Sequence, residues 1–118
     1  MAGKFTQAAD EVVAGIGLIR EGAPEAIKAF GALSLAATAH KALDPKTKEL
    51  MALAISVAVH CDGCVAYHTR AARKHGATRE EVAETVALAV YMGGGPAAVY
   101  GAQAIRAYDE FAGAAPTG

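Results

Sequence analysis

Hydrophobic positions along this chain recur with the spacing of an α-helix, and no run alternates apolar and polar residues as a half-buried strand would. Alanine, the strongest helix former, fills about a quarter of the positions. The pattern predicts an all-α fold, a helical bundle of about five to six helices. With 118 residues and no internal repeat or linker, residues 1–118 are expected to form a single domain.

The first half of the chain predicts two helices and the start of a third. One covers about residues 6–20 and ends at the turn that follows. The next begins at Pro24, a residue suited to the first helical position, and ends near His40. A third helix begins after Asp44, whose side chain can cap it, and continues to His60. Because residues 50–59 are apolar nearly all round, this third helix is expected to be the central buried one.

The second half predicts a helix that carries both cysteines and ends at His75-Gly76. The next helix opens with a capping box formed by Thr78 and Glu81, and it ends at the glycine run 93–95.

That glycine run follows no strand and precedes no Lys-Ser/Thr pair. It is therefore interpreted as a helix break or a close-packing point and not as a phosphate-binding loop. A last helix is expected over about residues 96–111, and the tail 113–118 is expected to be frayed.

Composition and charge exclude several classes of protein. Hydrophobic residues make up 53% of the chain and charged residues 19%, which is too apolar for a disordered protein and suggests that other subunits cover some apolar surface. The net charge is −1 without a basic stripe, which argues against nucleic-acid binding. Apolar stretches fall short of a membrane span, and the first residues lack a secretory signal, so a cytoplasmic location is expected.

The candidate chemistry lies in residues 58–72, AVHCDGCVAYHTRAA. On a helix, Cys61, Cys64 and His68 fall within an arc of about 60° and face the same way. A neighbouring imidazole or a helix amino end favours the reactive thiolate. In a reducing compartment, a close cysteine pair is more typical of catalysis or metal binding than of a structural disulfide.

Two other interpretations of this cluster stay open. The cysteines can be buried thiols that act as small hydrophobic residues. They can also belong to a metal site with His68 and a fourth ligand from His60 or Glu49, although one CxxC without a second cysteine pair matches no standard structural zinc spacing.

The third predicted helix carries a stripe of residues that leads towards the cysteines: Glu49, Leu53, Ser56 and His60. From spacing alone, Glu49 is interpreted as a solvent-facing residue of the first turns. His75 lies roughly 16 Å beyond Cys64 along the helix axis, too far for direct chemistry.

Residues 49–95 resemble the alkyl hydroperoxidase D-like, or carboxymuconolactone decarboxylase, family. The resemblance rests on a glutamate followed after eleven residues by CxxC, three residues and a histidine: Glu49, Cys61, Cys64 and His68. The downstream segment GATREEVAETVALAVYMGGGPAAVY is also similar, and the resemblance covers about residues 40–105.

The resemblance implies an all-α homo-oligomer, a trimer or hexamer. From the ligand count no bound zinc is expected, and no cofactor is expected either. It also implies a CxxC-dependent peroxidase or disulfide reductase in which Cys64 attacks a hydroperoxide and Cys61 closes a disulfide. His68 and Glu49 would form a proton relay, which reverses the interpretation of Glu49 as merely solvated. A lipoyl- or thioredoxin-like dithiol protein would then reduce the disulfide.

The chain departs from the family's prototype at Gly63, where the prototype has a histidine, and this bears on peroxidase strength and partner choice. The decarboxylase branch lacks the CxxC, so its presence argues against lactone decarboxylation. Two other function classes remain: a redox- or metal-sensing module without turnover, and a cofactor-free acid–base enzyme that uses Glu49 and His68. In a simple helical hairpin Glu49 lies opposite residue 71, which brings it nearer to His68 than to Cys64.

Overall fold

The computed structural model describes residues 3–113, and within this range the chain forms six α-helices and no strand. The predicted all-α fold is therefore confirmed. The expected frayed tail lies, apart from Gly113, outside the described residues. In chain order the helices are α1 (Lys4–Gly22), α2 (Pro24–Thr38), α3 (Pro45–Ala58), α4 (Asp62–Lys74), α5 (Arg79–Gly93) and α6 (Gly95–Phe111).

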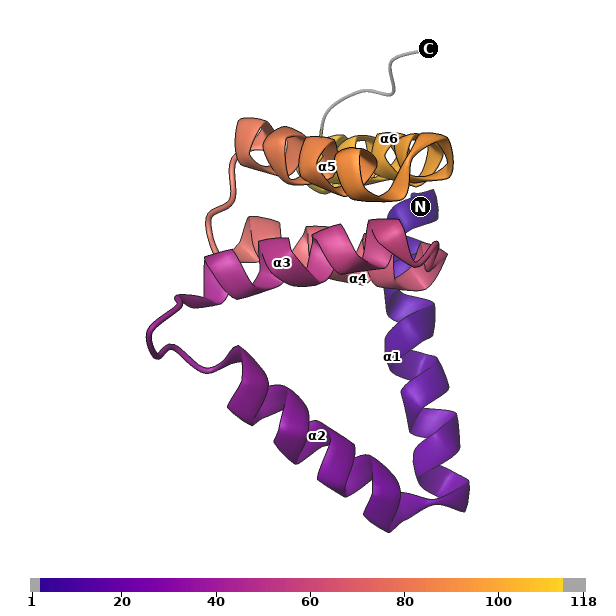
Figure 1. The fold of residues 1–118 in the computed structure, drawn as a ribbon. Helices are drawn as coiled ribbons and strands as arrows, with labels where there is room; N and C mark the ends of the chain where they lie inside the picture. The colour runs from indigo at the N-terminus through magenta and orange to yellow at the C-terminus, as the bar shows by residue number, and fades with distance from the viewer. Residues whose placement is uncertain (1–2, 114–118) are drawn as a thin grey trace.

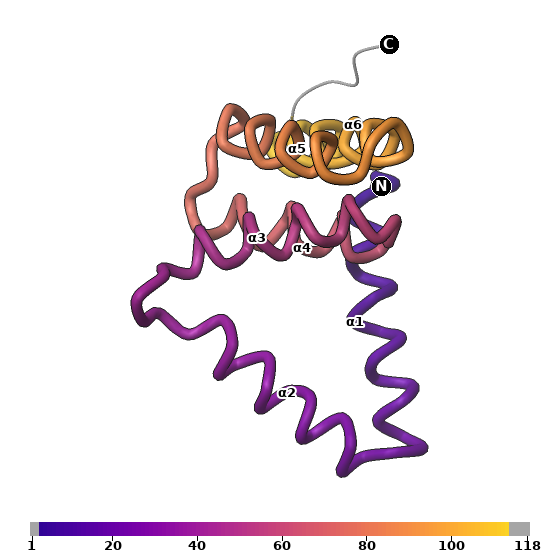
Figure 2. The backbone as a smooth tube through the Cα atoms, viewed as in Figure 1, coloured from indigo at the N-terminus to yellow at the C-terminus, as the bar shows by residue number. Residues whose placement is uncertain are grey.

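The helices form two stacked pairs and a projecting arm. Figure 1 shows the pair α3 and α4 lying beneath the pair α5 and α6. The tube in Figure 2 shows α1 running down from these layers and α2 returning towards α3, so that α1, α2 and the α3–α4 pair enclose a triangle. In the described part of the chain, no helix is long and apolar enough to cross a membrane.

The core lies between the two stacked pairs and consists of small and medium side chains. Leu53, Val57, Val65 and Val82 are fully buried there, together with several alanines. Small residues allow α5 and α6 to approach closely. At Gly101 of α6, for example, an added Cβ would overlap the side chain of Val86 on α5.

One face of α3 is exposed, so the expectation of a central buried helix holds for only one side of it. Leu53 and Val57 face the core, but Met51, Ile55 and Val59 are 50%, 62% and 64% exposed. These three residues recur every fourth position and form an apolar stripe on the outside of the chain.

Local signals determine most of the helix ends. The Asp44 carboxylate accepts a hydrogen bond from the Thr47 amide at 2.7 Å, which caps α3 as predicted. The predicted capping box of Thr78 and Glu81 is present at the start of α5. Gly94, at a φ of 75°, separates α5 from α6, which confirms the helix break.

The α1–α2 arm stands away from the core. No residue of α2 is buried. The Cα radius of gyration is 14.5 Å, whereas a compact chain of this length would have roughly 13.5 Å. The amino end of α1 is nevertheless attached to α6, because Glu110 accepts hydrogen bonds from the Phe5 and Thr6 amides and the Thr6 hydroxyl.

Candidate functional site

The turn between α3 and α4 positions the two cysteines. His60 adopts a left-handed conformation, with a φ of 59°, and α3 ends before it, two residues earlier than predicted. Cys61 is the N-cap residue of α4, and its sulfur accepts a hydrogen bond from the Cys64 amide at 3.3 Å. Cys61 and Cys64 form a disulfide, with their Cα atoms 5.2 Å apart. The first turn of α4 therefore holds the two sulfur atoms together at the amino end of the helix.

A histidine–carboxylate pair lies one turn further along α4. The Nδ1 atom of His68 is 2.7 Å from Oε2 of Glu49, which α3 presents across the α3–α4 interface. The hairpin places Glu49 within reach of His68, as its register predicts. Glu49 is only 7% exposed, so the solvent-facing interpretation from spacing alone is wrong. A carboxylate buried in this way needs a partner, and His68 provides one.

Another histidine, His60, packs against α6. The ring of His60 stacks on Tyr100 of α6, with the ring centroids 4.8 Å apart, and so contacts α6 instead of serving the cysteines. Within residues 3–113, no group of three or more His, Cys, Asp and Glu side chains is arranged to hold a metal ion. Ser56, on the same stripe as Glu49, is buried and donates its hydroxyl to the Ala52 carbonyl.

An apolar cleft of about 460 Å³ opens beside the disulfide, between α1, α2 and α4. Both Cys64 and His68 line it, whereas Cys61 does not. The cleft therefore exposes the second cysteine and the histidine to the same bound molecule. Its other lining residues are Val12, Val13, Ile16, Arg20, Ile27, Phe30, Gly31, Ser34 and Tyr67.

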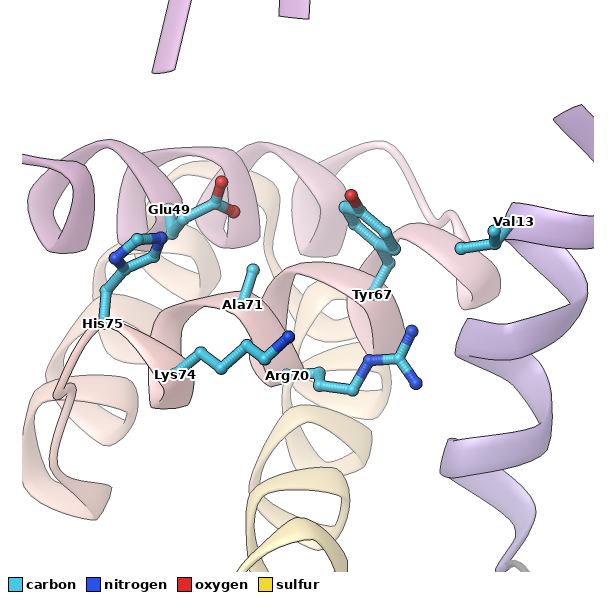
Figure 3. Close-up of a pocket in the computed structure, with 7 residues that line it drawn as sticks. All are labelled: Val13, Glu49, Tyr67, Arg70, Ala71, Lys74 and His75. Carbon is cyan, nitrogen blue, oxygen red and sulfur yellow. The ribbon is translucent and has the colours of Figure 1, made fainter. Parts of the chain in front are cut away.

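A second, polar cleft of about 330 Å³ reaches Glu49 of the histidine–carboxylate pair. Figure 3 shows Glu49 and His75 at one end of it and Val13 of α1 at the other, with Arg70 and Lys74 on α4 between them. His68 lines the apolar cleft and Glu49 lines the polar one. The hydrogen-bonded pair therefore connects the two clefts.

Gly63 lies where α1 passes over the amino end of α4. A Cβ atom at this position would come within 2.7 Å of the Val12 side chain. A histidine here, as in the prototype that the sequence resembles, therefore requires the Val12 side chain or α1 itself to shift.

The walls that α1 and α2 contribute to the apolar cleft are not predicted from the sequence. One face of α1 carries a residue of the cleft at every fourth position: Val12, Ile16 and Arg20. This spacing is the sequence feature that could have indicated the wall. Nothing local indicates, however, that this face meets Cys64.

Comparisons with known proteins assign the chain to a family. Residues 24–107 match the model of the carboxymuconolactone decarboxylase family. The chain belongs to this family. The family match begins at α2, earlier than the resemblance seen in the sequence, which starts at about residue 40.

The chain is similar to a carboxymuconolactone decarboxylase family protein from Legionella pneumophila whose crystal structure was solved in the apo form. The two sequences are 44% identical, and the structures superpose with a TM-score of 0.87 over 92% of this chain and 96% of that one. An uncharacterised protein of Cupriavidus necator is 42% identical over 79% of this chain and 82% of its own length. Uncharacterised protein 4 in the cox locus of Paracoccus denitrificans is 38% identical over 73% of this chain and 78% of its own.

Proposed function

We propose that this family member is a thiol–disulfide oxidoreductase with peroxidase-type activity, which reduces hydroperoxides through Cys61 and Cys64. The observation that carries the proposal is the position of the disulfide. It lies one helical turn from a hydrogen-bonded His68–Glu49 pair, and Cys64 shares the apolar cleft with His68. A nucleophile, a base and a residue that orients the base are the parts such chemistry needs.

In the first step the reduced Cys64 transfers its proton to His68. Glu49, as a carboxylate, accepts a hydrogen bond from the Nδ1–H group of His68, which leaves Nε2 of His68 free to act as the base. The Cys64 thiolate attacks the terminal peroxide oxygen, so that a sulfur–oxygen bond forms and the oxygen–oxygen bond breaks. Cys64 becomes a sulfenic acid, and the peroxide becomes an alkoxide that takes the proton from His68 to give an alcohol.

In the second step Cys61 resolves the sulfenic acid. Its sulfur attacks Cys64, a disulfide forms, and hydroxide leaves with the Cys61 proton as water. A lipoyl- or thioredoxin-like dithiol protein then reduces this disulfide through a mixed disulfide, and its own two thiols become oxidised. A reducing compartment such as the cytoplasm would supply this donor.

Trapping experiments on single variants test the assignment of the two sulfurs. We expect Cys64→Ser to abolish peroxide turnover and Cys61→Ser to oxidise once, leaving a sulfenic acid at Cys64 that a dimedone reagent labels. His68→Ala should slow this oxidation by about 100-fold near neutral pH and less at alkaline pH, where the thiolate forms unaided. Glu49→Gln should show a milder form of the same defect.

The opposite labelling pattern would reverse the two roles. Label at Cys61 in the Cys64→Ser variant, with none at Cys64 in the Cys61→Ser variant, would mean that the amide at the helix amino end activates the thiol more than His68 does. Oxidation without catalytic turnover in the presence of a dithiol donor would instead indicate a redox sensor. An acid–base enzyme that uses only Glu49 and His68 would keep its activity without either cysteine.

We also propose that the chain acts as a homo-oligomer, a trimer or a hexamer. The support is the apolar stripe on α3 and a second one on α5 formed by Leu88, Tyr91 and Met92, which are 60%, 83% and 75% exposed. The two helices pack against each other, so the stripes lie on neighbouring elements. Apolar surface of this extent is typical of a protein–protein contact.

A further inference from the structure

The apolar cleft contains a single permanently charged side chain, Arg20. Apolar side chains line most of the remaining wall, from Val12 and Ile16 on α1 to Ile27 and Phe30 on α2. Within residues 3–113, the Arg20 guanidinium has no ion-pair or hydrogen-bond partner. Arg20 is exposed, and a guanidinium at the edge of an apolar cleft offers a carboxylate five donors.

Arg20 and the disulfide lie at opposite ends of the cleft. Val12 marks the disulfide end, because its side chain packs against Gly63, the residue before Cys64. Arg20 follows Val12 by eight residues of α1, which corresponds to about 12 Å along the helix. Figure 1 shows that α1 and α2 meet at the corner of the triangle farthest from α4, and Arg20 lies in the last turn of α1 before that corner.

From this arrangement we infer that the preferred peroxide is an amphipathic one, a fatty-acid-type hydroperoxide whose chain lies between α1 and α2 and whose carboxylate pairs with Arg20. The inference rests on the proposed function, since it places the peroxide group at Cys64. Hydrogen peroxide would leave the apolar walls unused, and an uncharged alkyl hydroperoxide would leave Arg20 unpaired. Only a chain with an anionic end uses both features of the cleft.

Two other roles for this region have different consequences. A cation in the last turn of α1 interacts favourably with the helix dipole, a role that requires no ligand. A second copy of the chain could also cover the cleft. Either role predicts that a fatty acid and its methyl ester bind alike.

Equilibrium binding tests the inference without any turnover. Calorimetry on the full-length Cys64→Ser protein, with linoleic acid and with methyl linoleate below their aggregation concentrations, should show that the acid binds more tightly. Arg20→Gln should weaken binding of the acid by about fivefold, the upper range for an exposed ion pair. Gly31→Trp, at a position on the cleft where an added Cβ meets no atom within 4 Å, should weaken binding of both ligands.

Turnover supplies a second readout with a matched control. The ratio of kcat/KM for linoleic acid hydroperoxide to that for its methyl ester should fall about fivefold in Arg20→Gln, through KM. The same ratio should not change in Arg106→Gln, an exposed arginine of α6 outside the cleft. An unchanged ratio in Arg20→Gln, or equal binding of acid and ester, would overturn the inference.

The two proposals fail in different ways. If no peroxide is turned over but the acid still binds through Arg20, the proposed function fails and the cleft remains a carboxylate site. If cumene hydroperoxide is reduced but linoleic acid does not bind, the peroxidase stands and the inference is wrong.

Discussion

At the scale of single residues, the site depends on a close contact that the cysteine motif does not reveal. In the sequence, Gly63 stands out as the position where the family's prototype has a histidine, but in the structure it is where α1 packs on α4 through Val12. The same contact brings the α1 wall of the apolar cleft beside Cys64. A larger side chain at position 63 would therefore alter the cleft as well as the stability of the fold.

Replacement of Gly63 by alanine tests this contact. Alanine normally stabilises a helix relative to glycine, but here its Cβ would approach Val12 to 2.7 Å, and we expect a loss of about 1–3 kcal/mol of unfolding free energy. Gly31→Ala on α2, where an added Cβ meets nothing within 4 Å, should instead stabilise by up to about 1 kcal/mol. The measurement is urea unfolding of each variant.

A double-mutant cycle assigns the cost to the contact. If Val12 causes the clash, Gly63→Ala should cost less in a Val12→Ala background, with a coupling of about 1 kcal/mol or more. An equal loss of unfolding free energy in the two backgrounds would mean that Gly63 is needed for the backbone conformation of α4 and not for its packing against Val12.

At the scale of helices, the sequence predicts what depends on neighbours in the chain and misses what depends on distant ones. Asp44 and Thr78 cap their helices through residues three positions away, so their motifs are visible in the sequence. Glu49 and His68 were anticipated because α3 and α4 are consecutive and antiparallel. The carboxylate that holds the amino end of α1 comes from Glu110, more than 100 residues away, and no local pattern encodes that pairing.

Glu110 makes the position of α1 sensitive to pH. Burial raises the pKa of Glu110, but the hydrogen bonds from the Thr6 amide, the Thr6 hydroxyl and the Phe5 amide outweigh it, so the pKa lies below the usual value of 4.5. A lowered pKa in the folded state means that the charged carboxylate stabilises the fold. This contribution is complete above pH 4.5 and is lost as the pH falls through the lower folded value.

Glu110→Gln should therefore release the amino end of α1. We expect a loss of about 1 kcal/mol near neutral pH, since the hydrogen bonds are partly exposed, and faster amide exchange in α1 than in α5. The stability difference from the wild type should shrink as the pH falls below 4.5. Glu84→Gln, an exposed glutamate of α5, is the matched control, and an equal effect there would rule out the anchoring role of Glu110.

At the scale of the whole molecule, the isolated chain leaves apolar surface that its own fold does not cover. The α1–α2 arm stands off the core, and α3 and α5 carry outward-facing stripes. A helix that is apolar all round predicts burial, and the chain alone buries only one side of α3. The sequence predicts that other subunits cover apolar surface, and the exposed side of α3 is a surface they would cover.

A charge placed on the apolar stripes of α3 and α5 tests whether copies of the chain assemble through them. Light scattering of the wild-type protein at micromolar concentration should give three or six times the 12.0 kDa of one chain. Ile55→Glu or Tyr91→Glu should reduce the mass towards that of a single chain, because burying an unpaired carboxylate in a contact costs several kcal/mol. Leu35→Glu, which is 76% exposed on the outlying α2, is the matched control. If Leu35→Glu dissociates the assembly and the other two variants do not, copies associate through the α1–α2 arm, and a partner would then border the apolar cleft itself.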